Sequence, residues 1–352
     1  MTEHPQDVQN VQQRSGPQTK NPDAWPYADS YDEVVAASQS HLVRYEDDHI
    51  RLVEVAYIPG VESEMHGSPY PVVIARDAPD PRIREVWLEP AGKLHGQGGG
   101  QAPPPLGLDY PVGMTISPLA PRAVLVTDSF PLHFYKIEFK RIDGEEFQTK
   151  WKEWYPWMVE PFEVLPNIDP RDTTRGPLVS ELYPFVAASE SYLAAPNNHY
   201  VRFQDDHIVF LEVVLRPNER ENLHGHQQPS VFARDIGAAP RVSGRTPLPE
   251  TRVQPPTNIP GLNQGGVSGD WKLVPEGING EGGGSGAPPE GMSQPSCATM
   301  GLQWPHAAAC STDWPVHFYR MQFKRVDGAG IRTRWREWYP WMARLADERR
   351  AP

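Results

Sequence analysis

The sequence predicts an all-β protein made of two similar units. With 40 prolines and 29 glycines among its 352 residues, the chain is poorly suited to long helices and well suited to short strands joined by turns. Side chains alternate with a period of two in runs such as 209–214 and 318–323, whereas helical periodicity is nearly absent. At roughly 100 to 200 residues per domain, this length also corresponds to about two domains.

Most of the sequence consists of two similar copies. The segment HLVRYEDDHIRLVEVAYIPG at 41–60 recurs as HYVRFQDDHIVFLEVVLRPN at 199–218, with an offset of 158 residues. A second block, FPLHFYKIEFKRIDG at 130–144, recurs as WPVHFYRMQFKRVDG at 314–328, where the offset is 184. The larger second offset indicates an insertion in the second copy, and we expect it to be a long irregular loop in the Gly/Pro-rich stretch 236–289.

These repeats divide the chain into four parts. We expect a disordered, polar N-terminal tail at 1–28 and a first β unit at 29–160. A segment rich in acids and prolines at 161–180 has the composition of a linker. The second β unit is expected at 181–345 and carries the 236–289 loop.

A tryptophan-rich octapeptide ends both copies, as WKEWYPWM at 151–158 and WREWYPWM at 335–342. Five large side chains in eight residues could form an aromatic binding surface. Because the octapeptide occurs in both copies, we instead expect it to pack against a unit or between the units.

Charge and composition exclude several classes of protein. A net charge of −12 repels phosphate backbones and acidic membrane surfaces, so we expect neither nucleic acid nor a membrane as a partner. The N-terminus has no apolar signal region, and no run of about 18 apolar residues follows, which predicts a soluble, cytoplasmic protein. Only Cys297 and Cys310 are present, so a disulfide framework and a cysteine-based zinc module are both excluded.

The duplication also sorts the histidines. Four of them in the first copy have a histidine at the matching place in the second: His41 with His199, His49 with His207, His66 with His224, and His133 with His317. Two histidines of the second copy do not, because His226 matches Ser68 and His306 matches Arg122. The pairs formed by His41, His49 and His133 persist where those two histidines are missing, so we expect packing or hydrogen bonding from them.

The second copy therefore has a candidate metal site. His224 and His226 lie two residues apart on a predicted strand, so both rings point to the same face. If that face lines a barrel interior, His306 from a later strand can complete a three-nitrogen site with open positions for water or substrate. The alternative is that His-x-His arises by chance, as short patterns easily do.

These motifs resemble the two-motif pattern of the cupin superfamily. In the second copy, PNERENLHGHQQPSVFARD is similar to the first cupin motif, and GLQWPHAAACSTD is similar to the second, which supplies the last histidine. The resemblance covers about residues 29–158 and 181–342 and is that of a bicupin. It implies two tandem jelly-roll barrels, also called double-stranded β-helices, with a metal held in a barrel mouth.

The second copy departs from the motif at two places. Ser230 or Val231 stands where the family has its glutamate ligand, so the carboxylate is missing. Gln228 could replace it as a weak fourth ligand or by orienting substrate or bound water, and otherwise it is a polar residue at a strand end. Asn218 stands at the glycine position of the motif, which requires only a turn residue that tolerates positive φ.

In the first copy, His66 stands with Ser68 and Arg122 at the other two ligand positions, and a guanidinium repels a divalent cation. We therefore expect a degenerate, metal-free first unit. It is either a structural domain or an anion pocket around Arg122 and His66.

Together the histidine set and the resemblance imply a metal-dependent enzyme acting on a small organic acid or an enolisable substrate. With Fe(II), the resemblance implies a three-histidine, dioxygenase-like oxygenase, whereas Zn(II), Mn(II) or Ni(II) would suit isomerase, lyase or hydrolytic chemistry. The alternative is a bicupin that binds a metal or a small ligand without catalysis, since the sequence identifies no general base. We expect one divalent transition metal per chain, a small-molecule substrate, and a monomer or homodimer.

Overall fold

The structure is a computed structural model and describes most of the two predicted units. The described residues are 25–88, 98–99, 111–116, 118–144, 146–181, 183–235, 271–272, 282–283, 295–307, 310 and 312–350. The predicted tail at 1–28 and loop at 236–289 therefore lie almost wholly outside them. Within these ranges, no helix has the length and apolar character needed to cross a membrane.

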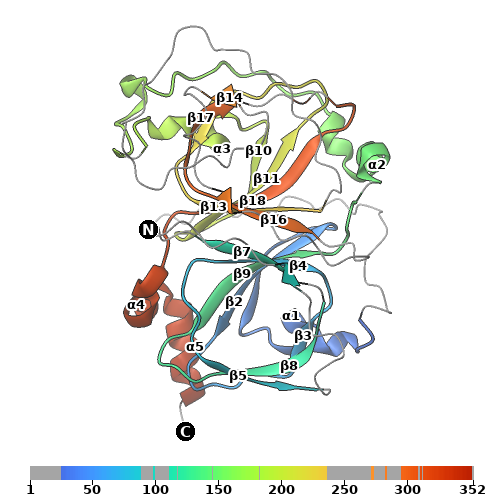
Figure 1. Cartoon of the computed structure of the whole chain (residues 1–352), viewed down its shortest axis with the longest axis vertical. Helices are drawn as coiled ribbons and strands as arrows, with labels where there is room; N and C mark the ends of the chain where they lie inside the picture. The colour runs from blue at the N-terminus through green and yellow to red at the C-terminus, as the bar shows by residue number, and fades with distance from the viewer. Residues whose placement is uncertain are drawn as a thin grey trace.

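The first unit contains nine described strands and forms the lower lobe in Figure 1. They are β1 (His41–Glu46), β2 (Ile50–Tyr57), β3 (His66–Ser68), β4 (Val72–Arg76), β5 (Ile83–Trp87), β6 (Gly98–Gly99), β7 (Val112–Ile116), β8 (Leu119–Val126) and β9 (Leu132–Phe139). A six-stranded sheet has the order β1-β2-β9-β4-β7-β6, and a three-stranded sheet has the order β3-β8-β5. The helical turns η1 (Asp29–Tyr31) and α1 (Glu33–Ala36) precede β1.

The second unit has the same arrangement and forms the upper lobe. Its strands are β10 (His199–Gln204), β11 (Ile208–Leu215), β12 (His224–His226), β13 (Ser230–Arg234), β14 (Trp271–Lys272), β15 (Gly282–Gly283), β16 (Ser296–Met300), β17 (Gln303–Ala307) and β18 (Val316–Phe323). The sheet orders are β10-β11-β18-β13-β16-β15 and β12-β17-β14. The turns η3 (Thr173–Arg175), η4 (Ala187–Ser189) and α3 (Ser191–Ala194) precede β10. The prediction of an all-β fold with two tandem units is confirmed, and each unit consists of two separate sheets rather than one closed barrel.

Both units begin with a hairpin that the sequence encodes locally. In the first, the Asp47 side chain accepts hydrogen bonds from the backbone N–H groups of His49 and Ile50, each at 2.8 Å. Asp205 makes the same two bonds in the second unit. This Asx turn explains why the Asp-Asp-His sequence occurs at the end of β1 and again at the end of β10.

The two large sheets pack against each other in one shared core. Alternate residues of β2, such as Ile50 and Leu52, face the second unit, and those between them face the interior of the first. β11 behaves in the same way, with Phe210 in the shared core. Every residue of β2 and β11 is therefore buried, which explains why both strands are nearly continuous apolar runs.

Helices are exchanged between the units. Helix α2 (Phe147–Trp154) and the turn η2 (Pro156–Val159) follow the first unit in the chain but pack on Val214 of the second. Conversely, α4 (Ile331–Trp338) and α5 (Pro340–Arg350), which follow η5 (Gly328–Gly330), pack on Ala56, Ile58 and Phe130 of the first unit. Figure 1 shows α2 beside the upper lobe and α4 and α5 beside the lower one. The two tryptophan-rich octapeptides thus lie between the units.

Two buried histidine–aspartate pairs join the units. His49 Nε2 lies 2.8 Å from an oxygen of Asp235, and its Nδ1 lies 2.7 Å from the Tyr155 hydroxyl, which donates to Asp143. The same network recurs with the units interchanged, where His207 Nε2 lies 2.8 Å from Asp77. There the Nδ1 atom contacts the hydroxyl of Tyr339, which donates to Asp327.

These contacts keep His49 charged. Burial lowers its pKa, but the carboxylates of Asp143 and Asp235 outweigh burial and raise the pKa to about 9. The pKa of His207 is raised as well: burial lowers it, but Asp77 and Asp327 together outweigh burial. The pair of His49 and Asp235 is therefore ionic at neutral pH, and both histidines have partners at both ring nitrogens.

A folded-state pKa above the unfolded value of about 6.5 means that His49 stabilises the fold fully below pH 6.5 and loses this contribution as the pH rises through about 9. The contribution of His49 to the free energy of unfolding should therefore fall by on the order of 3 kcal/mol across that range, and the raised pKa of His207 should add a loss in the same direction. His49→Gln should weaken the decline and His49→Gln/His207→Gln should abolish it, as measured by urea unfolding at several pH values. His41→Gln, a buried histidine away from this interface, should retain it. An undiminished decline in the double variant would contradict this account.

The helix exchange makes each unit depend on tryptophans from the other. Trp335→Ala should destabilise the chain by about 3–5 kcal/mol, and the local effect should lie in the first unit. Hydrogen exchange should quicken at Ala56 and Ile58 in that variant, whereas Trp151→Ala should quicken it at Val214. If hydrogen exchange quickened only in the unit that precedes each tryptophan in the chain, the helices would not be swapped between the units.

Candidate metal centre

The three predicted ligands of the second unit lie on two neighbouring strands. His224 of β12 is the cross-strand partner of His306 of β17, and His226 pairs with Gln303 one irregular step along. The ring centroids of His224 and His306 are 4.7 Å apart, and that of His226 lies 5.1 Å from the first and 5.4 Å from the second. All three side chains are buried.

The glycine between the two β12 histidines is required by close packing. A Cβ atom at Gly225 would lie 2.1 Å from the Tyr183 hydroxyl and 3.0 Å from the carbonyl oxygen of Gln303. Tyr183 and the β17 backbone therefore press directly on the back of this strand. A residue larger than glycine would not fit at this position, so glycine separates the two histidines whose rings lie on the inner face.

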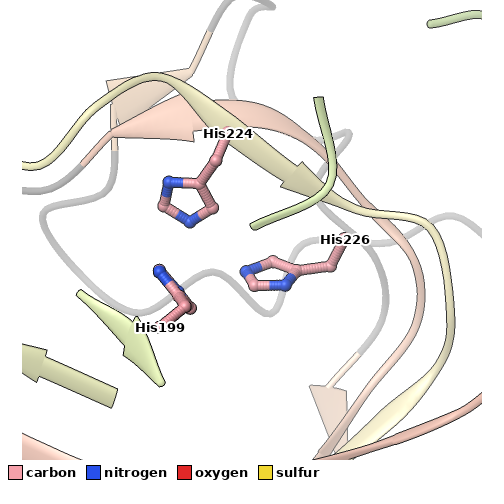
Figure 2. Close-up of side chains that lie close together, drawn as sticks. All are labelled: His199, His224 and His226. Carbon is pink, nitrogen blue, oxygen red and sulfur yellow. The ribbon is translucent and has the colours of Figure 1, made fainter. Parts of the chain in front are cut away.

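A fourth histidine joins the cluster. His199, the first residue of β10, has its ring centroid 4.4 Å from that of His224 and 5.5 Å from that of His226. One nitrogen from each of these three rings lies within 4.8 Å of the other two, and Figure 2 shows the rings converging on a common point. Sequence reasoning missed His199 because its counterpart His41 is present in the first unit, which suggested a packing role for both.

Each of the four rings is oriented by a hydrogen bond at Nδ1. The acceptors are all oxygen atoms: Ala195 O at 3.3 Å for His199, Asn222 O at 2.8 Å for His224, Gln322 Oε1 at 2.8 Å for His226, and Trp304 O at 2.9 Å for His306. An oxygen acceptor at Nδ1 selects the tautomer with its proton there, so the lone pair is on Nε2. This is the arrangement in which protein histidines bind transition metals.

The amide of Gln322, on β18, is fixed by its own partners. Its Nε2 atom donates to Glu190 at 3.1 Å and to the side-chain oxygen of Gln228 at 3.2 Å. Since the nitrogen faces these two oxygens, the amide oxygen must face His226 and accept its Nδ1 proton. Glu190 and Gln228 thus act on the cluster through Gln322.

Gln228 lies between β12 and β13 rather than on a continued strand, and it contacts Gln322. A buried carboxylate does lie near the cluster, but it comes from Glu190, which precedes β10, with an oxygen 3.8 Å from Nδ1 of His226. Glu190 is therefore on the outer side of that ring. At the motif's glycine position, Asn218 has φ of 59°, as Gly60 has 75° at the matching position.

The cluster is held neutral. Burial, followed by the positive charge of Arg320, lowers the pKa of His199 to about 3. Burial also lowers the pKa of His224 and of His226 well below 6.5. Because the rings are unprotonated at neutral pH, a cation would not have to displace protons from them.

Arg320 supplies a buried positive charge beside the histidines. It lies on β18, is 2% exposed, and stacks its guanidinium carbon 4.5 Å from the centre of the Phe232 ring. Its charge is the largest influence after burial on the pKa of both His199 and His226. The cluster therefore lies in a positive field even without a cation.

The first unit uses the equivalent positions differently. The hydroxyl of Tyr57 lies 2.8 Å from Nε2 of His66 and 3.3 Å from Nε2 of His41, so it contacts the nitrogen atoms that a metal would need. Leu215, its counterpart, has no hydroxyl. Ser68, which replaces His226, accepts a hydrogen bond from the ammonium group of Lys136.

Comparison with known proteins gives similarity in fold. No family model matches the chain. No curated protein matches it either. Among solved structures, it is similar to oxalate decarboxylase from Lactobacillus farciminis, with 12% identity over 81% of this chain and 80% of that one and a TM-score of 0.18. It is also similar to salicylate 1,2-dioxygenase from Pseudaminobacter salicylatoxidans, with 10% identity over 79% and 72% and a TM-score of 0.20. For AerE from Microcystis aeruginosa the identity is 7%, the coverage 81% and 99%, and the TM-score 0.18. At these values the functional argument rests on the geometry of the four histidines.

The Gln322 contact predicts a measurable effect on metal binding. Gln322→Leu removes the acceptor that orients His226 and should weaken the affinity for a divalent transition metal by about 10- to 100-fold. Competition with a chromophoric chelator measures the change. Gln204→Leu makes the same substitution at an exposed site at the end of β10 and should leave affinity unchanged. Equal affinities for wild type and Gln322→Leu would show that His226 is not a ligand.

Proposed function

We propose that the chain is a two-unit cupin whose second unit holds one divalent transition metal and acts on a small organic acid. The observation that carries the proposal is a cluster of four buried imidazoles, each with an oxygen acceptor at Nδ1. In three of them, His199, His224 and His226, one ring nitrogen each lies within 4.8 Å of the other two. Burying polar imidazoles costs free energy, and none of these rings serves to fill an apolar core. Such a cluster therefore indicates a functional site.

The ligands would be His224, His226 and His306, as the sequence predicts, joined by His199. An all-imidazole set suits Fe(II), Zn(II), Ni(II) and Cu(II), and we favour Fe(II), with Zn(II), Mn(II) and Ni(II) as alternatives. Bound there, such an ion would supply an open coordination position and Lewis acidity toward an oxygen of the substrate.

The protein's own residues support an anionic substrate. The four ligands are neutral, so they do not reduce the charge of the cation. Arg320 adds a second buried positive charge, which attracts a carboxylate or an enolate to the same site. Gln228 would contribute by holding Gln322, and hence His226, in position.

Among the reactions open to such a site, we propose oxygenation. The buried carboxylate nearest to the cluster, Glu190, is bonded to the backbone N–H of Gln227 and to Gln322 on the outer side of His226. A second buried carboxylate, Glu221, lies 4.0 Å from Nδ1 of His224 and so is also on the outer side of its ring. Among the described residues, neither carboxylate is near the Nε2 side of the rings, where a substrate would need a general base. Lyase and isomerase reactions need such a base, whereas a bound redox metal would itself supply the activation of dioxygen that oxygenation requires.

The second candidate is a bicupin that binds a metal or a small ligand without catalysis. Its support is the same lack of an identifiable base among the described residues. The two candidates predict the same metal content and differ only in turnover.

The proposal predicts about one transition metal per chain, measured by elemental analysis of purified protein. His224→Ala/His306→Ala should contain none, and His199→Ala should lose affinity as well. The matched variants His66→Ala and His41→Ala, at the same positions of the first unit, should keep the metal. No metal in the wild type after reconstitution with Fe(II), Zn(II) and Mn(II) would refute the proposal.

Turnover then separates the two candidates. The Fe(II)-loaded chain should consume oxygen with at least one compound from a panel of diketones, dihydroxyaromatic acids and thiols, and Arg320→Met should raise the KM for the anionic members. Metal-loaded protein that consumes no oxygen across the panel would favour the non-catalytic candidate.

A further inference from the structure

The first unit contains a buried charged cluster where the second unit has its histidines. Lys136 and Glu33 are each 0% exposed and form an ion pair. Arg122, which is 8% exposed, stands where the second unit has His306. Ser191 of the second unit matches Glu33, so this carboxylate is particular to the first unit.

Two atoms of this cluster have no hydrogen-bond partner. These are Oε1 of Glu33 and Nη1 of Arg122, both fully buried and unpaired among the described residues. The other carboxylate oxygen of Glu33, Oε2, is held by Lys136, and Nε of Arg122 donates to Glu85 at 3.0 Å. Within the described residues, one acceptor and one donor are therefore held by neighbouring contacts and lack a partner of their own.

The side chains of Glu33 and Arg122 both come from positions next to the pair His41 and His66. His41 Nε2 lies 3.8 Å from Oε2 of Glu33, and its ring centroid lies 4.5 Å from that of His66. His66 is in turn the cross-strand partner of Arg122 on β8. The Tyr57 hydroxyl closes the histidine nitrogens from the side, so the unsatisfied groups are those of Glu33 and Arg122.

Stability alone does not account for these charges. Buried ion pairs are generally no more stabilising than well-packed apolar side chains, and an unsatisfied buried polar atom costs about 1–3 kcal/mol. A unit that had lost its ligand and served only as a scaffold would favour apolar residues here. The retained donor and acceptor therefore point to a ligand that satisfies both.

We propose that the first unit binds a small hydroxycarboxylate between Arg122 and Glu33. The guanidinium donates from Nη1 to the ligand's carboxylate, and the ligand's hydroxyl donates to Oε1 of Glu33. A neutral hydroxyl is favoured over an ammonium group because the Lys136 ammonium already pairs with the same Glu33 carboxylate. Trp87 supports the Arg122 guanidinium from 5.3 Å and keeps it in place. This inference is independent of the metal site in the second unit.

Calorimetric titration of the full chain with glycolate tests the proposal, and acetate is the matched probe without a hydroxyl. Glycolate should bind with one site per chain and at least about tenfold more tightly than acetate. Binding should persist in His224→Ala/His306→Ala, which separates it from the second unit. Arg122→Gln and Glu33→Gln should each weaken it by about tenfold or more, whereas Arg82→Gln, whose side chain is 83% exposed, should not.

A crystal of the wild-type chain soaked in glycolate gives a result that does not depend on variants folding. The ligand should lie within hydrogen-bond distance of Nη1 of Arg122 and Oε1 of Glu33. An ordered water alone at these atoms, together with no saturable heat, would overturn the proposal. Equal binding of glycolate and acetate, or binding lost with the second-unit histidines, would overturn it as well.

Discussion

The mutual burial of the two large sheets is the constraint on which the rest of this structure depends. β2 and β11 are buried on both faces, because one face covers the interior of its own unit and the other lies in the shared core. Neither sheet could expose its outer face to water without a large hydrophobic penalty. The exchanged helices and the two histidine–aspartate pairs extend this association to its edges, where Tyr155 and Tyr339 contribute hydroxyls.

Within this shared framework the two interiors have diverged in chemistry while keeping their geometry. The same strand positions carry His226 and Ser68, or His306 and Arg122. In one unit the resulting set is neutral and converges on a point, as a cation requires. In the other, a tyrosine hydroxyl contacts the remaining imidazoles and charged side chains surround them. One backbone thus carries two different sets of polar side chains at equivalent positions.

The period-two alternation and the repeat offsets were sufficient to predict the all-β fold, since both depend on residues close in sequence. The placement of His224 and His226 on one face also followed from strand geometry, because residues two apart share a face, and His306 is the cross-strand partner of His224. His199 could not be found in this way, because whether it belongs to the cluster depends on how β10 lies against β12. Glu190 was missed for the same reason, as it approaches from the segment before β10.

The exchanged helices leave a weak pattern in the sequence. Phe147, Trp151 and Trp154 recur at helical spacing, but only over two turns, which is too short to stand out among the strands. Their packing on the opposite unit was beyond sequence reasoning, since the two octapeptides differ at one position only and so do not distinguish the two units. The positive φ at Asn218, in contrast, was predictable from one turn position alone.

The helix exchange also changes what the covalent connection between the units is needed for. Since α2 completes the second unit and α4 and α5 complete the first, each half carries a part that the other lacks. The largely exposed segment 161–180 connects the two halves and is hydrogen-bonded to the second unit, where Asn222 donates to the carbonyl of Leu165 and Leu223 donates to Asn167. Its covalent link keeps the halves at high local concentration. A chain nicked in that segment should remain assembled, and two separately synthesised fragments should reconstitute the molecule by complementation. In this respect the two halves of the chain resemble the two subunits of a heterodimer.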